Sequence, residues 1–581
     1  MSDITTKNTH DKRQVARFVA AAVAAAAACV ASTAARADDF DRGGGDHDRD
    51  HHERPFFIPG NLVVSRSVYD NKAATVKVGT VLPPNCAATL GGCAPAAGAP
   101  FDGVYPEVWN NDTYDASFGI TSKILLDQIT PFGGYLGSIE VPNSSQRDVG
   151  PTSDQLVTSF SSKSEIALNL SLDGRFLTFG GYVAPVDSVD VSNSNTPGAV
   201  DLTNPVGDSV LRAVARVDAF GHFRFTETNA YSGNNGRAAI LNNLGGAEVI
   251  YTAGNAGNGA NPQPDGVVLG AGAQILARSK FPEAVQTPGT PVPVASFSVT
   301  QLGAKADKIG KDDNFRGMTV FNNILYYTKG SGSNGVNTVY FVDTSGTACP
   351  KGVGLPVAGA ALPTGGLAYN SGTLATSGLP SNMCILAGFP AVPNKSLTTI
   401  TAFPFGVWFA DANTLYVADE GDGYSGGPDL YSHAAAQTTA GLQKWVFDAS
   451  SAQWHLAYTL TTELGLGVPY SVKGYPSGSN ATTGLPWSPA ADGLRNITGH
   501  VDGHGLVTIW GITSTVSGNG DQGADPNRLV AITDVLGNTD PAVAAKERFF
   551  NVRSAQFGEV LRGVSFTPGS DLLRSASDPV R

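Results

Sequence analysis

Phe405-Gly-Val-Trp-Phe-Ala-Asp411 and Leu415-Tyr-Val-Ala-Asp419, joined by a short turn, form the stretch that decides the fold. Aromatic and β-branched residues favour strands, and Asn413 between the two runs favours a turn. Looser copies of this hairpin begin near Ile166, Arg237, Arg316 and Arg495. Most copies continue into two further apolar runs, so the repeating unit has four antiparallel strands. Such a unit, repeated along a chain, is typical of a β-propeller blade.

The two ends of the chain together supply the strands of a sixth blade. Arg562-Gly-Val-Ser-Phe566 matches the first strand of a blade, but almost no chain remains to complete it. The runs that begin at Asn61, Lys123 and Tyr135 offer the missing strands. Pairing the C-terminal strand with these N-terminal strands closes the ring and leaves no open sheet edge. We therefore predict an all-β, six-bladed β-propeller with four antiparallel strands per blade.

The residues 405–419 and 561–569 resemble NHL-type repeats of six-bladed propellers. That superfamily includes gluconolactonase-like and paraoxonase-like hydrolases, quinoprotein sugar dehydrogenases and ligand-binding scaffolds. The resemblance extends over residues 60–570 at the level of blades. It implies the fold and does not choose among these chemistries.

The chain is expected to begin with a segment that directs export. Lys7, Lys12, Arg13 and Arg17 precede an apolar run of Ala and Val, and Ala35-Arg36-Ala37 offers a cleavage site. This pattern predicts a secretory signal peptide over residues 1–37, cleaved after Ala37, and a secreted or periplasmic protein. Residues 38–59 form an Asp/His-rich leader that we expect to be disordered, 60–570 the propeller, and 571–581 a tail.

Cleavage leaves four of the five cysteines. In an oxidising compartment, the local pairs Cys86–Cys93 and Cys349–Cys384 are favoured among three connectivities. Cleavage also removes five basic and two acidic residues, which changes the net charge from −12 to −15. An acidic chain of this kind is not expected to bind nucleic acid, and we expect no stable membrane insertion and a monomer.

Four arginines occupy the same place at the start of four innermost strands. They are Arg237, Arg316, Arg495 and Arg562. Sixfold geometry would point them towards the axis, where clustered cations need a partner. One interpretation is that each pairs with a nearby carboxylate: Asp312, Asp313, Asp492 or Glu559. The other is an anion-binding site for a carboxylate, a phosphate or a quinone cofactor.

Loops rich in Gly, Asn and Asp join the second and third strands of the blades, all on one face of the expected ring, and three of them exceed 20 residues. Oxygen-bearing side chains in these loops are candidate ligands for Ca²⁺ or another divalent cation. The candidates are Asn111, Asp112, Asn234, Asn255, Asp419 and Asp422. In gluconolactonase-like propellers, similar side chains hold a metal that activates water. Turn formation explains the same residues without a metal.

Histidine is scarce on this face, where His433 alone is expected. Carboxylate or metal chemistry is therefore favoured over a histidine acid or base. Gly423-Tyr-Ser-Gly-Gly427 fits the G-x-S-x-G pattern of serine hydrolases, but we expect no helix after it, as a nucleophile elbow would need.

These features predict a propeller that binds a small polar or glycan ligand, and they leave open whether it is an enzyme. The first hypothesis is a metal-assisted hydrolase or lactonase acting on a small polar or carbohydrate-derived anion. The alternatives are a non-catalytic glycan- or protein-binding propeller and a quinoprotein dehydrogenase.

Overall fold

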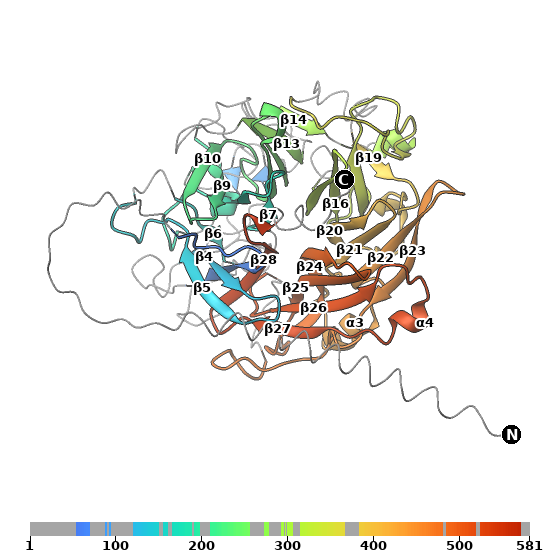
Figure 1. Cartoon of the computed structure of the whole chain (residues 1–581). Coiled ribbons are helices and arrows are strands. Elements are labelled where there is room, and N and C mark those ends of the chain that lie inside the picture. The colour runs from blue at the N-terminus through green and yellow to red at the C-terminus, as the bar shows by residue number, and fades with distance from the viewer. Residues whose placement is uncertain are drawn as a thin grey trace. The chain divides into compact units, whose positions relative to one another are not determined.

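A computed structural model shows six sheets arranged in a ring (Figure 1). The structure describes residues 54–69, 88–89, 92–93, 120–149, 155–160, 165–188, 191–197, 209–255, 272–277, 292–295, 297, 299–305, 314–365, 383–479, 484–518 and 523–570. The expected signal peptide, most of the leader and the tail lie outside these residues.

Three blades are built from the first half of the chain and its last strand. Blade 1 contains, from the axis outwards, β28 (Glu559–Phe566), β1 (Leu62–Val68), β4 (Thr121–Ile129) and β5 (Tyr135–Glu140), with β6 (Thr158–Ser159) beside β4. Blade 2 contains β7 (Asn169–Leu170), β8 (Phe176–Tyr182), β9 (Arg212–Asp218) and β10 (Phe223–Thr228). Blade 3 contains β11 (Gly236–Asn242), β12 (Val249–Gly254), β13 (Ala273–Ala277) and β14 (Val292–Ala295).

The other three blades follow in chain order. Blade 4 contains β15 (Met318–Phe321), β16 (Ile324–Lys329), β17 (Thr338–Val342) and β19 (Met383–Leu386), with β18 (Val353–Gly354) parallel to β19. Blade 5 contains β20 (Pro404–Asp411), β21 (Thr414–Asp419), β22 (Gly441–Asp448) and β23 (Gln453–Leu460). Blade 6 contains β24 (Ala490–Val501), β25 (Leu506–Val516), β26 (Arg528–Val535) and β27 (Phe550–Ser554).

Shorter elements lie between the blades' strands. They are the two-stranded sheet of β2 (Ala88–Thr89) and β3 (Gly92–Cys93), the helices α3 (Leu430–Ala436) and α4 (Pro541–Ala544), and the 3-10 turns at Val191–Asn193, Leu244–Gly246, Val299–Leu302 and Asn394–Ser396. The six-bladed, four-stranded architecture predicted from the repeats is confirmed. No helix among the described residues is long and apolar enough to cross a membrane.

The ring closes between the two ends of the chain, as predicted. β28 pairs antiparallel with β1, with Leu62 opposite Phe566 and Val64 opposite Val564. β1 continues the sheet to β4 through the pair Leu62 and Ile129. The packed region begins slightly before residue 60, because Phe57 is fully buried and its N–H donates to Ala219 O at 2.8 Å.

The hydrophobic core lies in the seams between neighbouring blades. Between blades 1 and 6, Leu62 and Val64 pack with Trp510 and Leu529. Between blades 5 and 6, a polar contact joins the apolar ones: Lys444 Nζ lies 3.0 Å from Asp534 Oδ2, and both side chains are fully buried. Separating the two side chains would leave each charge buried without its partner, which is costly. The pair therefore fixes the two blades in register.

Glycine allows the innermost strands to meet closely at the axis. A Cβ on Gly317 would lie 2.0 Å from Phe405 O, one on Gly406 2.4 Å from Arg495 O, and one on Gly563 2.5 Å from Ile166 O. Gly317 and Gly563 directly follow two of the registered arginines. A side chain at these positions would push neighbouring blades apart.

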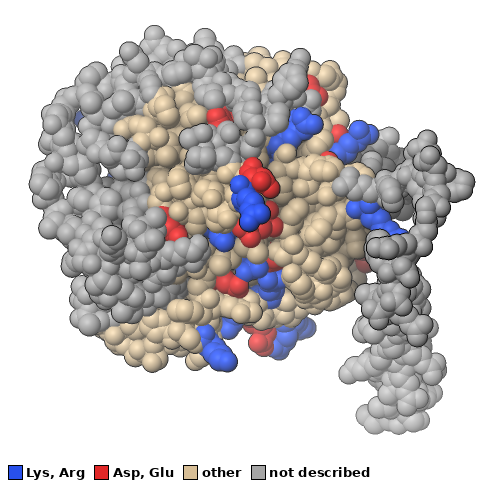
Figure 2. Space-filling model, turned by 90° about the vertical axis from the view of Figure 1, so that its left-hand side faces the viewer, with Lys and Arg blue, Asp and Glu red and all other residues tan. Residues whose placement is uncertain are grey.

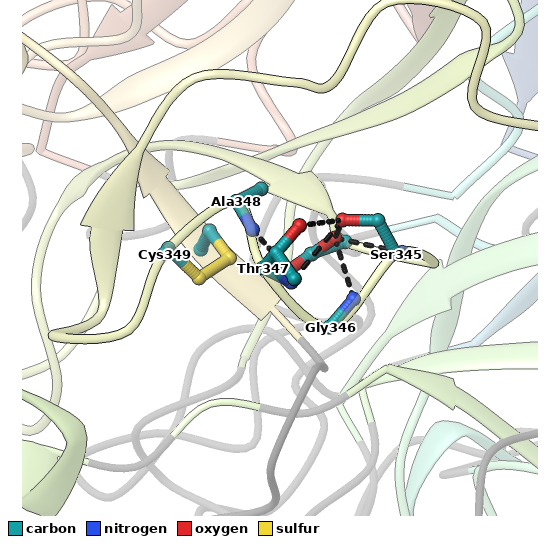
Figure 3. The surroundings of a disulfide bond; sticks show 7 residues. Ser345, Gly346, Thr347, Ala348 and Cys349 are labelled. Carbon is teal, nitrogen blue, oxygen red and sulfur yellow. Dashed lines mark hydrogen bonds between the residues drawn. A yellow bond between two sulfur atoms is a disulfide. The ribbon is translucent and has the colours of Figure 1, made fainter.

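A disulfide bond joins Cys349 to Cys384 in blade 4, with their Cα atoms 5.9 Å apart (Figure 3). The turn before Cys349 is held by Asp343, which accepts backbone hydrogen bonds from Ser345, Gly346 and Ala348. The predicted disulfide between Cys349 and Cys384 is therefore confirmed. The expected Cys86–Cys93 pair lies outside the described residues, apart from the backbone of Cys93.

Candidate functional site

Four arginine side chains are buried in or just before the innermost strands. Arg237, Arg316, Arg495 and Arg562 are each 2–6% exposed. Each precedes or begins the part of its strand that faces a central cavity of about 250 Å³, lined by residues of all six innermost strands. Together with Glu165 and Glu420 they form what we call the axial arginine layer.

Glu420 connects two of these arginines. It is the first residue after β21, so it lies on the face where the second strands end. Its Oε2 accepts a hydrogen bond from Arg495 Nε at 3.1 Å, and its Oε1 lies 3.7 Å from Arg316 Nε. One carboxylate from blade 5 thus serves arginines of blades 4 and 6.

The arrangement around Glu420 depends on Gly421. Its φ of 78° belongs to the left-handed region, and a Cβ there would lie 2.4 Å from Asp492 Oδ2. Only glycine meets both demands without strain. The chain therefore turns tightly after Glu420, which leaves its carboxylate at the axis.

The other two arginines donate hydrogen bonds to uncharged acceptors among the described residues. Arg237 Nη1 donates to Asn314 Oδ1 and, at 2.9 Å, to Phe315 O. Arg562 Nη2 donates to Phe160 O and, at 3.3 Å, to Ser159 O. Arg562 also interacts electrostatically with Glu165.

Glu165 lies on the blade 2 side of the layer, where it accepts hydrogen bonds from Tyr182 and, at 2.9 Å, from Thr158. Burial raises the pKa of its carboxyl, and these hydrogen bonds and Arg562 oppose the rise. Burial therefore disfavours the charged form of Glu165.

The guanidinium groups of the layer also repel one another. The pKa of Arg237 is lowered well below its usual value, first by burial and then by repulsion from Arg316. Arg495 Nη2 is buried and makes no hydrogen bond within the described part of the chain. Buried cations in this state are stabilised by an anion.

Two of the four carboxylates expected to neutralise the arginines have other partners among the described residues. Glu559 pairs with Arg66. Asp492 accepts hydrogen bonds from Gly423 N at 2.8 Å and Gln437 Nε2 at 2.5 Å. Asp312 and Asp313 lie outside the described residues. Sequence reasoning missed Glu420, which directly follows a second strand, one blade before Arg495.

The candidate metal ligands fall into separate contacts. Asn255 Nδ2 donates to Asn234 Oδ1 at 2.7 Å in blade 3. In blade 5, Asp419 is buried and accepts from the backbone of Phe403 at 2.8 Å, whereas Asp422 lies 2.6 Å from His433. Asn111 and Asp112 lie outside the described residues. The cation site remains a prediction.

Among the described residues, one group of His, Cys, Asp or Glu side chains is close enough to share an ion: Asp343, Cys349 and Cys384. The two cysteines form the disulfide, so they offer no thiolate to a metal.

The stretch after Gly427 differs from expectation. We expected no helix, but α3 begins at Leu430. Ser425 lies in irregular chain six residues after β21 ends. It therefore does not stand on a strand-to-helix elbow, and the serine-hydrolase pattern gains no support from the helix.

In the described part of the face shown in Figure 2, several acidic and basic side chains lie beside one another. Charges of opposite sign arranged in this way partly cancel at a distance.

Asp492 gives a prediction about pH. Burial raises its pKa to about 7 in the folded protein, from 3.8. The unfolded chain then releases this proton at lower pH than the folded chain, so the stability from the raised pKa is complete below about pH 4 and lost as pH rises to 7. Asp492→Asn removes this loss. We expect the free energy of unfolding of wild type, relative to that of Asp492→Asn, to fall by up to about 1.4 kcal/mol per pH unit between pH 4 and 7.

Urea unfolding of both proteins at pH 4, 5.5, 7 and 8 measures this difference. Parallel stability profiles of wild type and Asp492→Asn would show that the carboxyl titrates normally.

Comparison with known proteins adds the following. No protein-family model and no curated protein sequence matches the chain. Among solved structures, the chain is similar to a polysaccharide lyase of family PL25, an ulvan lyase bound to GlcA(1-4)Rha3S, at 12% identity and a TM-score of 0.28, covering 86% of this chain and 97% of the lyase. A second structure of a PL25 ulvan lyase matches at 11% identity and a TM-score of 0.24, with the same coverage. At these values we draw no conclusion about activity from the resemblance.

Proposed function

We propose that this propeller binds a small organic anion, a carbohydrate-derived carboxylate, at the axial arginine layer. The buried Nη2 of Arg495, which makes no hydrogen bond within the described part of the chain, carries the proposal. A bound carboxylate would accept a hydrogen bond from this atom, at the axis that Arg495 shares with Arg237, Arg316 and Arg562. Paired N–H groups of guanidinium fit the two oxygens of a carboxylate, which favours this anion over a spherical one.

The setting supports a small polar ligand. The layer belongs to the face that carries the long second-to-third-strand loops, where a rigid scaffold usually presents its binding residues. Buried electrostatic contacts are screened less by salt than surface contacts. A ligand held there would therefore keep its affinity in the salt of an extracellular medium.

Calorimetric titration with d-glucuronate and with d-glucose tests the proposal, because the two sugars differ by a carboxylate in place of a hydroxymethyl group. We expect glucuronate to bind and glucose to bind at least tenfold more weakly. Arg495→Gln should lower the affinity for glucuronate by about 10–100-fold, since a hydrogen bond to a charged group contributes about 1.5–3 kcal/mol.

Two variants make the result specific. Arg495→Lys keeps the charge but loses the planar fork, so its affinity should fall between wild type and Arg495→Gln. Arg175→Gln removes an arginine whose side chain is 69% exposed and should leave binding unchanged. Equal binding of both sugars, or equal affinity of wild type and Arg495→Gln, would refute the proposal.

A further inference from the structure

A histidine and an aspartate lie together on the loop that supplies Glu420. His433 Nε2 is 2.6 Å from Asp422 Oδ2, and their side chains are 36% and 26% exposed. A carboxylate only accepts hydrogen bonds, so Nε2 carries the proton, and the neutral ring has its lone pair on Nδ1. The pair has the geometry of a base held in one tautomer by a neighbouring acid.

The imidazole is also held from one side. The ring of Tyr424 stacks on it with centroids 4.0 Å apart and an angle of 24° between the planes. Tyr424 OH donates to Asp429 Oδ1 at 3.0 Å, and the backbone N–H of His433 donates to Asp429 O at 2.8 Å. Within the described residues, the contact with Asp422 is the one hydrogen bond of the ring. Nδ1 is thus left to act on a ligand.

This loop is fastened to the strand that carries Arg495. The backbone N–H of Asp422 donates to Gln437 Oε1 at 2.9 Å, and Gln437 Nε2 donates to Asp492 Oδ1. Asp492 lies three residues before Arg495 on β24. Asp422 is two residues from Glu420, a span of at most about 7 Å between Cα atoms. Asp422 therefore lies close to the axial arginine layer along the chain, and we call the position of the histidine pair the rim of the layer.

From this juxtaposition we infer that His433, positioned by Asp422, is the general base of an esterase or lactonase activity towards carboxylated substrates, an inference that rests on the proposed anion site. Water attacks the ester carbonyl carbon while His433 Nδ1 takes one of its protons. The tetrahedral intermediate then expels the alcohol oxygen, and the imidazolium returns the proton to that oxygen. The products are an acid and an alcohol, and the histidine is neutral again.

The roles of the two residues differ. His433 exchanges the proton with the reacting atoms, whereas Asp422 acts through the histidine, by fixing its tautomer and stabilising the imidazolium. The axial arginines hold the substrate's distant carboxylate and so place its ester near the rim. Binding and turnover are therefore expected to depend on separate residues.

Two nitrophenyl esters of equal chain length test the inference: 4-nitrophenyl hydrogen glutarate, which carries a carboxylate, and neutral 4-nitrophenyl pentanoate. We expect wild type to prefer the charged ester. His433→Gln should lower kcat by about 10²–10⁴-fold with KM unchanged, as removal of a general base does. Asp422→Asn should lower kcat in the same way, while Arg495→Gln should raise KM for the charged ester alone.

The chain contains a matched control. His455 on the outer strand β23 also has an exposed ring beside an aspartate, 3.9 Å from Asp448. His455→Gln should leave turnover of both esters unchanged. Hydrolysis by His433→Gln at the wild-type rate would overturn the inference.

Failure of the inference and failure of the anion site give different results. A wild type that binds glucuronate but hydrolyses neither ester overturns the catalytic role of His433 and leaves the anion site standing. His433-dependent hydrolysis with no preference for the charged ester, together with no glucuronate binding, overturns the anion site and the substrate class.

Discussion

Glu420→Gln is expected to lower the free energy of unfolding by about 3–5 kcal/mol, the usual cost of removing one partner from a buried ion pair. Glu420 is 3% exposed and serves both Arg316 and Arg495. Glutamine keeps the shape of the side chain but leaves two buried guanidinium groups without their shared anion. Urea unfolding monitored by tryptophan fluorescence measures the loss.

The same variant tests whether the loss is electrostatic. Glucuronate should restore part of the lost stability in Glu420→Gln, because a ligand that binds only the folded state stabilises it, whereas glucose should not. Glu463→Gln provides the control, since Glu463 pairs with Arg548 at 2.5 Å with both side chains more than half exposed. It should change stability little. A loss in Glu420→Gln no larger than in this control would contradict the account of the axial layer.

Ending the chain after Gly558 is expected to abolish cooperative folding. This truncation removes β28, the innermost strand of blade 1, and with it Leu561, Val564 and Phe566 from the seam between blades 1 and 6. β1 would then become an open edge, and the ring would no longer close. Thermal unfolding followed by circular dichroism should lose its sharp transition, and size-exclusion chromatography should show aggregates or an expanded chain.

A shorter truncation separates ring closure from mere loss of chain. Ending after Ser570 removes the expected tail and keeps β28 with its pairing to β1. This variant should unfold as wild type does. A sharp transition at an unchanged temperature in the chain that ends at Gly558 would show that the terminal strands do not close the ring.

The fold was predictable because its signal recurs. Each hairpin alone is ambiguous, but the run that starts at Phe405 has counterparts at Arg237, Arg316 and Arg495, and the unmatched strand at Arg562 requires partners from the N-terminal segment. Periodicity of this kind averages out local irregularities. One innermost strand, β7, is only two residues long, and its place was still evident from the spacing of the others.

The site was predictable only in part. Register placed the four arginines at one level, because equivalent positions in equivalent blades share a height and a direction. Their partners do not repeat: Glu420 belongs to one blade, and Glu165 precedes another. Register therefore says nothing about them.

Contacts between residues at the two ends of a loop also could not be predicted from the sequence. The pairing of Asp422 with His433 depends on α3, a seven-residue helix that was not expected. It brings a side chain eleven positions away back to the start of the loop. The sequence favours carboxylate or metal chemistry for this face because histidine is scarce there, and it shows no spacing that joins Asp422 to His433.

A crystal structure of the protein with d-glucuronate is the most direct test of the central claim. The account predicts the sugar carboxylate at the axis, within hydrogen-bond distance of Arg495 Nη2 and on the side of Arg316 and Arg495 away from Glu420. The account would be contradicted if a carboxylate of the protein itself occupied this position at the axis and no sugar were bound there.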